Sequence, residues 1–188
     1  MEKKYSVVFY SESIVGPVKN MKDLLKSKVP KNWYNSCNSE AHITICEFTI
    51  DDSKLDFYKQ KLLKIANTFI PFQVSLNSFG SFPASNAFFI APDHNSKIKL
   101  ESIMKKTQNA LKPLKMYKSS EPHMSIGRKL TPENLKIASE LFTTIDLKFL
   151  CDQIVLREFD PVKKQFFVID TFKFGSNPEP EFVQGSLF

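Results

Sequence analysis

Two short segments of the chain have nearly the same pattern, and together they restrict the fold more than any other feature. They read AHITI at residues 41–45 and PHMSI at residues 122–126, each an apolar run with a histidine and, two residues later, a small hydroxyl residue. Side chains alternate across a β-strand, so the histidine and the hydroxyl share one face. Two of the chain's three histidines occupy these matched positions. The pattern therefore predicts two strands that each present an imidazole and a hydroxyl.

The segments after these two strands also follow one order, a predicted helix and then two strand-like runs. After the first histidine strand (40–48) come a helix at 51–66 and strands at 72–79 and 87–91, and after the second (121–128) a helix at 131–143 and strands at 145–159 and 165–174. The histidines are 81 residues apart, which is the spacing of a duplicated lobe. We predict an α+β fold of two pseudo-symmetric lobes, with two antiparallel sheets, outer helices and a central cleft that carries both histidine strands.

The remaining segments complete one domain. A strand is expected at 5–10, and helices at 17–28 and 96–111, with Pro17 at a first helical position. The domain is expected to span residues 1–175. Residues 176–188 contain Pro and Gly without a period and are predicted to form a loosely ordered tail.

Charge and composition exclude some functions and favour others weakly. The net charge of +6 favours anionic partners, but nearly all of it is lysine, and helical lysines such as Lys22 are first expected on solvated faces. The three cysteines are widely spaced and are expected to act as small apolar residues, not as metal ligands or disulfides. No run is long enough to cross a bilayer or to serve as a signal peptide, so we expect a cytoplasmic protein without a membrane partner.

The paired motifs suggest acid–base chemistry on a phosphate ester. Histidine, with a pKa near 6.5, can act as acid or base at neutral pH, and Thr44 and Ser125 could donate hydrogen bonds to phosphate oxygens. The alternative is that His42 and His123 are only half-buried strand residues, which would require two matched contexts to be accidental. His94 lies in a turn before a helix and is interpreted as a surface or capping residue. No His-x-His or His-x-x-x-His occurs, so a zinc site is not expected.

With these motifs, His42-Ile43-Thr44-Ile45 and His123-Met124-Ser125-Ile126, the chain resembles the two-histidine (2H) phosphoesterase superfamily, in its bacterial 2′-5′ RNA ligase and cyclic phosphodiesterase branch. The segments FGSF (79–82) and PH (122–123) leading to GR (127–128) are also similar to that branch. The resemblance implies hydrolysis or formation of RNA 2′ phosphoester bonds, without a metal or other cofactor. It also implies His123 as the base and His42 as the acid in hydrolysis.

Further substrate contacts are expected near the histidines. Phe82 is predicted to form a wall of the cleft. Arg128 can bind phosphate only if the second histidine strand ends at Gly127 and turns, because alternation otherwise points it away from His123. Trp33, Tyr117 and Lys118 could stack on a base or contact backbone phosphate, although packing is the simpler role for the aromatic pair. Phosphate-cradling glycine loops are absent, so ATP-dependent ligation is not supported.

We therefore predict a metal-independent phosphoesterase that acts on 2′,3′-cyclic phosphate or 2′-5′ linkages, with an RNA end or a cyclic nucleotide as its partner and a monomeric state. The rival hypothesis is a non-catalytic module that binds an RNA end or a phosphorylated ligand in the same cleft. A weaker third hypothesis is an interaction protein that uses residues 182–188.

Overall fold

The computed structural model describes residues 1–30, 33–82 and 84–178. In chain order the elements are β1 (Glu2–Phe9), α1 (Glu12–Lys28), β2 (Ile43–Asp51), the 3-10 turn η2 (Asp52–Lys54), α2 (Leu55–Asn67), β3 (Phe72–Phe82), β4 (Ala87–Pro92), α3 (His94–Leu111), β5 (Lys115–Lys118), β6 (Met124–Gly127), α4 (Pro132–Leu141), β7 (Leu147–Cys151), β8 (Gln153–Asp160) and β9 (Gln165–Lys173). The predicted α+β class with antiparallel strands is confirmed.

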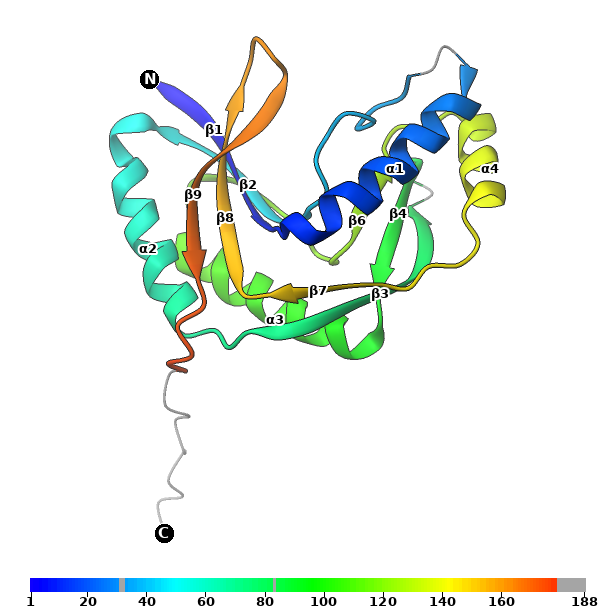
Figure 1. Cartoon of the computed structure of the whole chain (residues 1–188). Coiled ribbons are helices and arrows are strands. Elements are labelled where there is room, and N and C mark those ends of the chain that lie inside the picture. The colour runs from blue at the N-terminus through cyan, green and yellow to red at the C-terminus, as the bar shows by residue number, and fades with distance from the viewer. Residues whose placement is uncertain (31–32, 83, 179–188) are drawn as a thin grey trace.

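The strands form two halves that meet at the histidine strands. Their order is β7-β3-β4-β6-β2-β1-β8-β9, with β5 added beside β2. The halves are hydrogen-bonded into one sheet through the pairing of Ile43 in β2 with Met124 in β6. Helix α2 packs against β9, helix α3 packs across β2, β3 and β4, and helices α1 and α4 pack against the half formed by β7, β3, β4 and β6 (Figure 1). The two histidine motifs thus lie side by side at the centre of the sheet.

Three elements differ from the sequence prediction. Helix α1 begins at Glu12, not at Pro17, because Ser11 takes the extended N-cap conformation and Pro17 is accommodated inside the helix. The run expected as one strand at 145–159 is two strands that separate at Asp152, since β7 pairs with β3 and β8 pairs with β1. The short strand β5 was not expected. The other helix starts follow their capping residues, as at Thr131, whose hydroxyl accepts from the Asn134 N–H.

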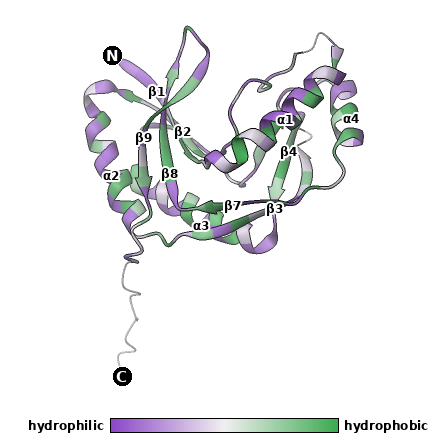
Figure 2. Cartoon of the chain, in the orientation of Figure 1, coloured by the Kyte–Doolittle hydropathy of each residue, from purple (hydrophilic) through white to green (hydrophobic). Residues whose placement is uncertain are grey.

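The core lies between the sheet and the helices. Ile43, Ile45, Met124 and Ile126 are fully buried, while the residues that alternate with them are partly exposed. Apolar residues accordingly concentrate in the central strands (Figure 2). The side of β2 opposite the histidine packs against helix α3, and Phe48 also packs on Tyr58 of helix α2 with ring centroids 5.5 Å apart. One face of the central strands is therefore filled, and the other is left for a site.

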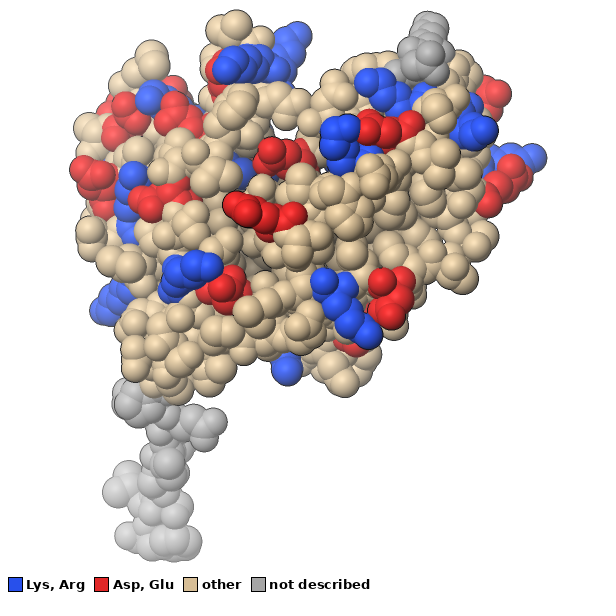
Figure 3. Space-filling view, in the orientation of Figure 1, with Lys and Arg blue, Asp and Glu red and all other residues tan. Residues whose placement is uncertain are grey.

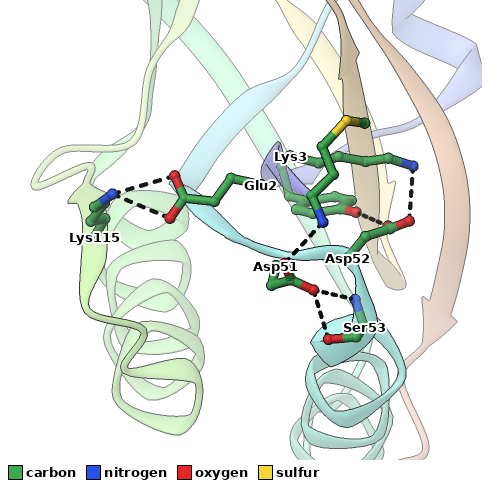
Figure 4. A network of polar contacts seen from close by, with 8 residues as sticks. Glu2, Lys3, Asp51, Asp52, Ser53 and Lys115 are labelled. Atoms are coloured by element: carbon green, nitrogen blue, oxygen red, sulfur yellow. Dashed lines mark hydrogen bonds and ion pairs between the residues drawn. The ribbon is translucent and has the colours of Figure 1, made fainter.

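A polar network fixes the far end of β2 (Figure 4). The Asp51 carboxylate accepts the Ser53 N–H at 3.0 Å and so caps η2. Asp52 accepts the Tyr5 hydroxyl at 2.8 Å and pairs with Lys3 at 3.2 Å. Strand β2 is thereby tied to β1 at the end remote from His42.

The chain after β9 stays close to the domain for a few residues. The Ser176 N–H donates to the Phe69 carbonyl at 2.9 Å, and the Asn177 N–H to the Asn67 carbonyl at 3.0 Å. The rest of the predicted tail, 179–188, and the proposed interaction segment 182–188 lie outside the described residues. Among the helices that the structure describes, none is long and apolar enough to cross a membrane.

Candidate active site

The two histidine motifs form a compact square on one face of the sheet. Ile43 and Met124 are register partners. One residue further along the antiparallel register, His42 lies opposite Ser125 and Thr44 lies opposite His123. The two histidines are thus diagonal neighbours, with Cα atoms separated by about 7–8 Å. All four polar side chains are half-buried, so both imidazoles and both hydroxyls belong to one partly open surface.

The two imidazoles are held in the same way. His42 Nδ1 is 2.7 Å from the Glu40 carbonyl oxygen, and His123 Nδ1 is 2.8 Å from the Glu121 carbonyl oxygen. A carbonyl can only accept, so each Nδ1 carries a hydrogen, and the neutral ring keeps the lone pair of Nε2 for chemistry. Each neutral imidazole can therefore take one proton at Nε2, and each protonated imidazole can give that proton, without changing its position.

The electrostatic surroundings of the histidines differ. Burial lowers the pKa of His42 well below 6.5, and the charges of Arg157, Lys22 and Arg128 lower it further. Burial also lowers the pKa of His123, although the nearby Glu121 partly offsets this. Both rings are thus neutral at pH 7 in the free protein, and His42 is the harder one to protonate.

Arg128 is the first residue after strand β6, which carries the second histidine motif. Strand β6 ends at Gly127, and the Arg128 N–H then donates to the Asn35 carbonyl at 3.0 Å. Its guanidinium Nε donates to the Ser36 hydroxyl at 2.8 Å, and its charge lowers the pKa of both histidines. Arg128 still forms an isolated antiparallel bridge with Asn35 after β6 ends, and a phosphate contact by Arg128 stays a prediction.

The loop that receives Arg128 is fixed by a buried lysine. Lys22, on α1, is 2% exposed, and its ammonium donates to the Ser36 carbonyl at 3.1 Å, the Ser39 carbonyl at 2.6 Å and the Ser39 hydroxyl at 2.9 Å. The expectation of a solvated Lys22 is wrong, because its three donors are all satisfied inside the fold. This clamp holds the segment that supports Arg128 and leads directly to Glu40, the acceptor of the His42 ring. No sequence pattern indicated it.

Two phenylalanines pack on the second histidine. The Phe82 ring meets His123 edge-on at a centroid distance of 4.9 Å, and Phe89 lies at 5.2 Å. The register pairs Phe89 with Ser125, which places it on the histidine face. Phe82 thus lies beside the site as a wall would, whereas Phe89, which the sequence did not single out, is the buried partner that supports it.

The other candidates lie further from the histidines. Trp33 is 56% exposed, and Lys118 is exposed on β5. Tyr117, 61% exposed, lines a hollow of about 260 Å³ further along β2. His94 is the exposed first residue of α3, where Asp93 provides the cap, so the surface interpretation holds. All three cysteines are buried free thiols.

Charge is mixed around the site. The surface is hollowed between the half that carries the β8–β9 hairpin and the half that carries α1 and α4, and on this face acidic and basic side chains are interspersed (Figure 3). No patch of one sign dominates the face seen there. Among the described residues, no group of three or more His, Cys, Asp or Glu could hold a metal ion.

Comparisons with known proteins define the class to which this fold and site belong. The chain matches the family model of the 2′-5′ RNA ligase superfamily over residues 16–162. The chain is therefore a member of the 2′-5′ RNA ligase superfamily, as its motifs indicated. No curated protein sequence was found to match it.

Solved structures show the same fold. LigT of E. coli in complex with 3′-AMP superposes with a TM-score of 0.64 at 11% identity, over 93% of this chain and 99% of LigT. The LigT complex with phosphate gives 0.62 at 11% identity, over 92% and 98%. A Thermus thermophilus protein gives 0.61 at 18% identity, over 93% and 98%. At these identities the likeness establishes the architecture, and the chemistry must be argued from the residues.

Proposed function

We propose that the protein is a metal-independent phosphoesterase that acts on 2′,3′-cyclic phosphate or 2′-5′ phosphodiester linkages of RNA or nucleotides. The main support is the matched geometry of His42 and His123: diagonal positions on paired strands, each with Nδ1 on a backbone carbonyl and a hydroxyl residue opposite. The phosphate and 3′-AMP complexes of the E. coli relative favour a ligand of this class. A cytoplasmic monomer remains our expectation.

The reaction needs one proton acceptor and one proton donor on opposite sides of phosphorus. In hydrolysis of a 2′,3′-cyclic phosphate, one Nε2 takes a proton from water as the water oxygen bonds to phosphorus. The bond from phosphorus to O3′ breaks, and the other ring, which enters the reaction as the imidazolium, gives its Nε2 proton to O3′, which leaves a 2′-phosphate. Thr44, Ser125 and Arg128 would bind the non-bridging oxygens, where negative charge increases in the transition state. The reverse sequence would form the bond.

The local charges favour His42 as the base and His123 as the acid, opposite to the assignment that the resemblance implied. Three cations act against the protonated form of His42, whereas Glu121 favours the protonated form of His123. A substrate whose leaving group is p-nitrophenol needs no acid. With a nucleoside 2′-(p-nitrophenyl phosphate), His123→Asn should therefore recover activity while His42→Asn should not. Recovery by His42→Asn alone would restore the original assignment.

The proposed function is tested by following 2′,3′-cyclic AMP with phosphorus NMR in the presence of EDTA. We expect the wild-type protein to form the 2′-phosphate, and His42→Asn or His123→Asn to slow it by about 100- to 10,000-fold. His94→Asn is the matched control, because that histidine is exposed and outside the site. A protein that binds the nucleotide but does not convert it would instead be the non-catalytic module.

A further inference from the structure

Arg157 lies on the same face of the sheet as the two motifs. It is the register partner of Ser6 in β1, which in turn pairs with Glu47 in β2. Ser6 and Val8 are two residues apart in β1, so their side chains share one face, and Val8 pairs with Thr44. Because of the bulge in the β1–β2 pairing, Arg157, Ser6 and Glu47 therefore lie on the face of Thr44. Arg157 therefore extends the histidine face two strands away from β2.

Among the described residues, no anion is directly bonded to this arginine. Arg157 is 5% exposed, and its one hydrogen bond runs from Nη2 to the neutral Ser6 hydroxyl at 3.2 Å. Its Nε has no acceptor among the described residues. The carboxylates whose charges act on Arg157 are Glu47, which pairs with Lys4 at 2.5 Å, and Glu40, and among the described residues neither is bonded to the guanidinium. A buried cation without a bonded anion strongly destabilises the folded state, so an arginine at this position suggests a function that needs its charge.

The surroundings of the guanidinium suit an anion. It lies over the Phe166 ring, 5.2 Å from the centroid, which fixes its plane. Burial lowers the pKa of Arg157 to about 10, so it is still protonated at neutral pH. Its charge also lowers the pKa of His42.

The position of Arg157 fits a phosphate next to the reacting one. Two strand spacings and two residues separate its Cα from that of Thr44, a distance of about 12 Å. An arginine side chain covers only part of that distance, so its guanidinium would meet a phosphate next to the reacting one and not the reacting phosphate itself. In an RNA chain that ends in a 2′,3′-cyclic phosphate, the adjacent phosphate is the 5′-phosphate of the terminal nucleotide.

We propose that Arg157 forms a second phosphate subsite for the 5′-phosphate of the nucleotide whose 2′,3′-phosphate reacts, so that the site selects RNA ends over cyclic mononucleotides. This inference rests on the proposed function for the identity of the first phosphate. The guanidinium gains in the complex the charged acceptor that it lacks in the free protein, and its fork suits two phosphate oxygens.

The test compares two ligands that differ by one phosphate, adenosine 2′-monophosphate and adenosine 2′,5′-bisphosphate, by isothermal titration calorimetry. The wild-type protein should bind the bisphosphate about 10- to 100-fold more tightly. Arg157→Met, which keeps the buried stem, should reduce this ratio to below about threefold, because the one charged donor group is gone. Lys163→Met, at the exposed tip of the same hairpin, should leave it unchanged. Because each ratio is measured within one protein, a reduced folded fraction does not alter it.

An unchanged ratio in Arg157→Met would overturn the subsite; if both ligands were weakened equally, Arg157 would instead lie at the reacting phosphate. Absence of any preference in the wild-type protein would also overturn it. The proposed function fails by a different result, which is tight binding without turnover of 2′,3′-cyclic AMP.

Discussion

Replacing Lys22 by methionine tests the clamp beneath the first histidine. The ammonium lies inside the protein with three acceptors from Ser36 and Ser39. Methionine keeps the apolar stem but removes the charge and the donors. At any single pH these effects oppose each other, since a desolvated charge disappears and two carbonyls lose their partner. The difference in free energy of unfolding between the two proteins, measured at two pH values, has no such ambiguity, because Lys22 is the only group that titrates in one protein and not in the other.

The magnitude follows from the pKa of Lys22, which burial lowers from 10.5 to about 8. The folded state therefore holds this proton less tightly than the unfolded chain does, at a cost of about 3 kcal/mol. The cost is fully present below pH 8 and declines as the pH rises from 8 to 10.5. Between pH 7 and pH 10 the wild-type protein should thus gain about 2 to 3 kcal/mol in free energy of unfolding relative to Lys22→Met.

Urea denaturation of both proteins at pH 7 and pH 10 measures this quantity. Groups that titrate in both proteins cancel in the comparison. Lys19→Met is the control, because Lys19 lies on the same helix but is exposed and pairs with Asp23. A difference between wild type and Lys22→Met that is the same at both pH values would refute the reasoning, since it would mean that Lys22 is not buried as a cation.

Two further predictions concern the site and its support. The pKa values of His42 and His123 both lie below 6.5 in the free protein, and the reaction needs one neutral and one protonated ring. The value of kcat/KM should therefore peak below pH 6.5. A maximum above pH 7.5 would contradict this. At Gly80, an added methyl group would lie 2.7 Å from the Phe89 ring, which packs on His123, so Gly80→Ala should lower the free energy of unfolding by about 1–3 kcal/mol and lower kcat/KM. Gly16→Ala, in helix α1 with open space around it, should instead raise stability by about 0.5–1 kcal/mol, and equal effects at the two glycines would show that the contact at Phe89 is unimportant.

Much of the fold could be predicted because the alternation of apolar and polar residues along the chain matches the buried and exposed faces of the sheet. The alternation around His42 and His123 predicted buried isoleucines and partly exposed polar residues, and the structure has both. The break at Asp152 was not predictable from hydrophobicity, because β7 and β8 are both apolar and differ only in the half of the sheet that they join.

The site was predictable only where its residues share a motif. The places of Thr44 and Ser125 follow from the strand period, whereas that of Arg128 depends on where β6 ends, at Gly127. Lys22 and Arg157 could not be found in this way, because each acts through burial of a charge, and burial depends on contacts far away in the sequence. In the sequence both resemble ordinary surface cations.

The central claim is that His42 and His123 act on one phosphate as a unit. It is tested most directly by kcat/KM for 2′,3′-cyclic AMP with wild type, His42→Asn, His123→Asn and the double variant. Groups that work together are not additive, so we predict that the double variant loses no more activity than the worse single variant. A double variant as active as the wild-type protein, or losses that multiply as for two independent sites, would contradict the account.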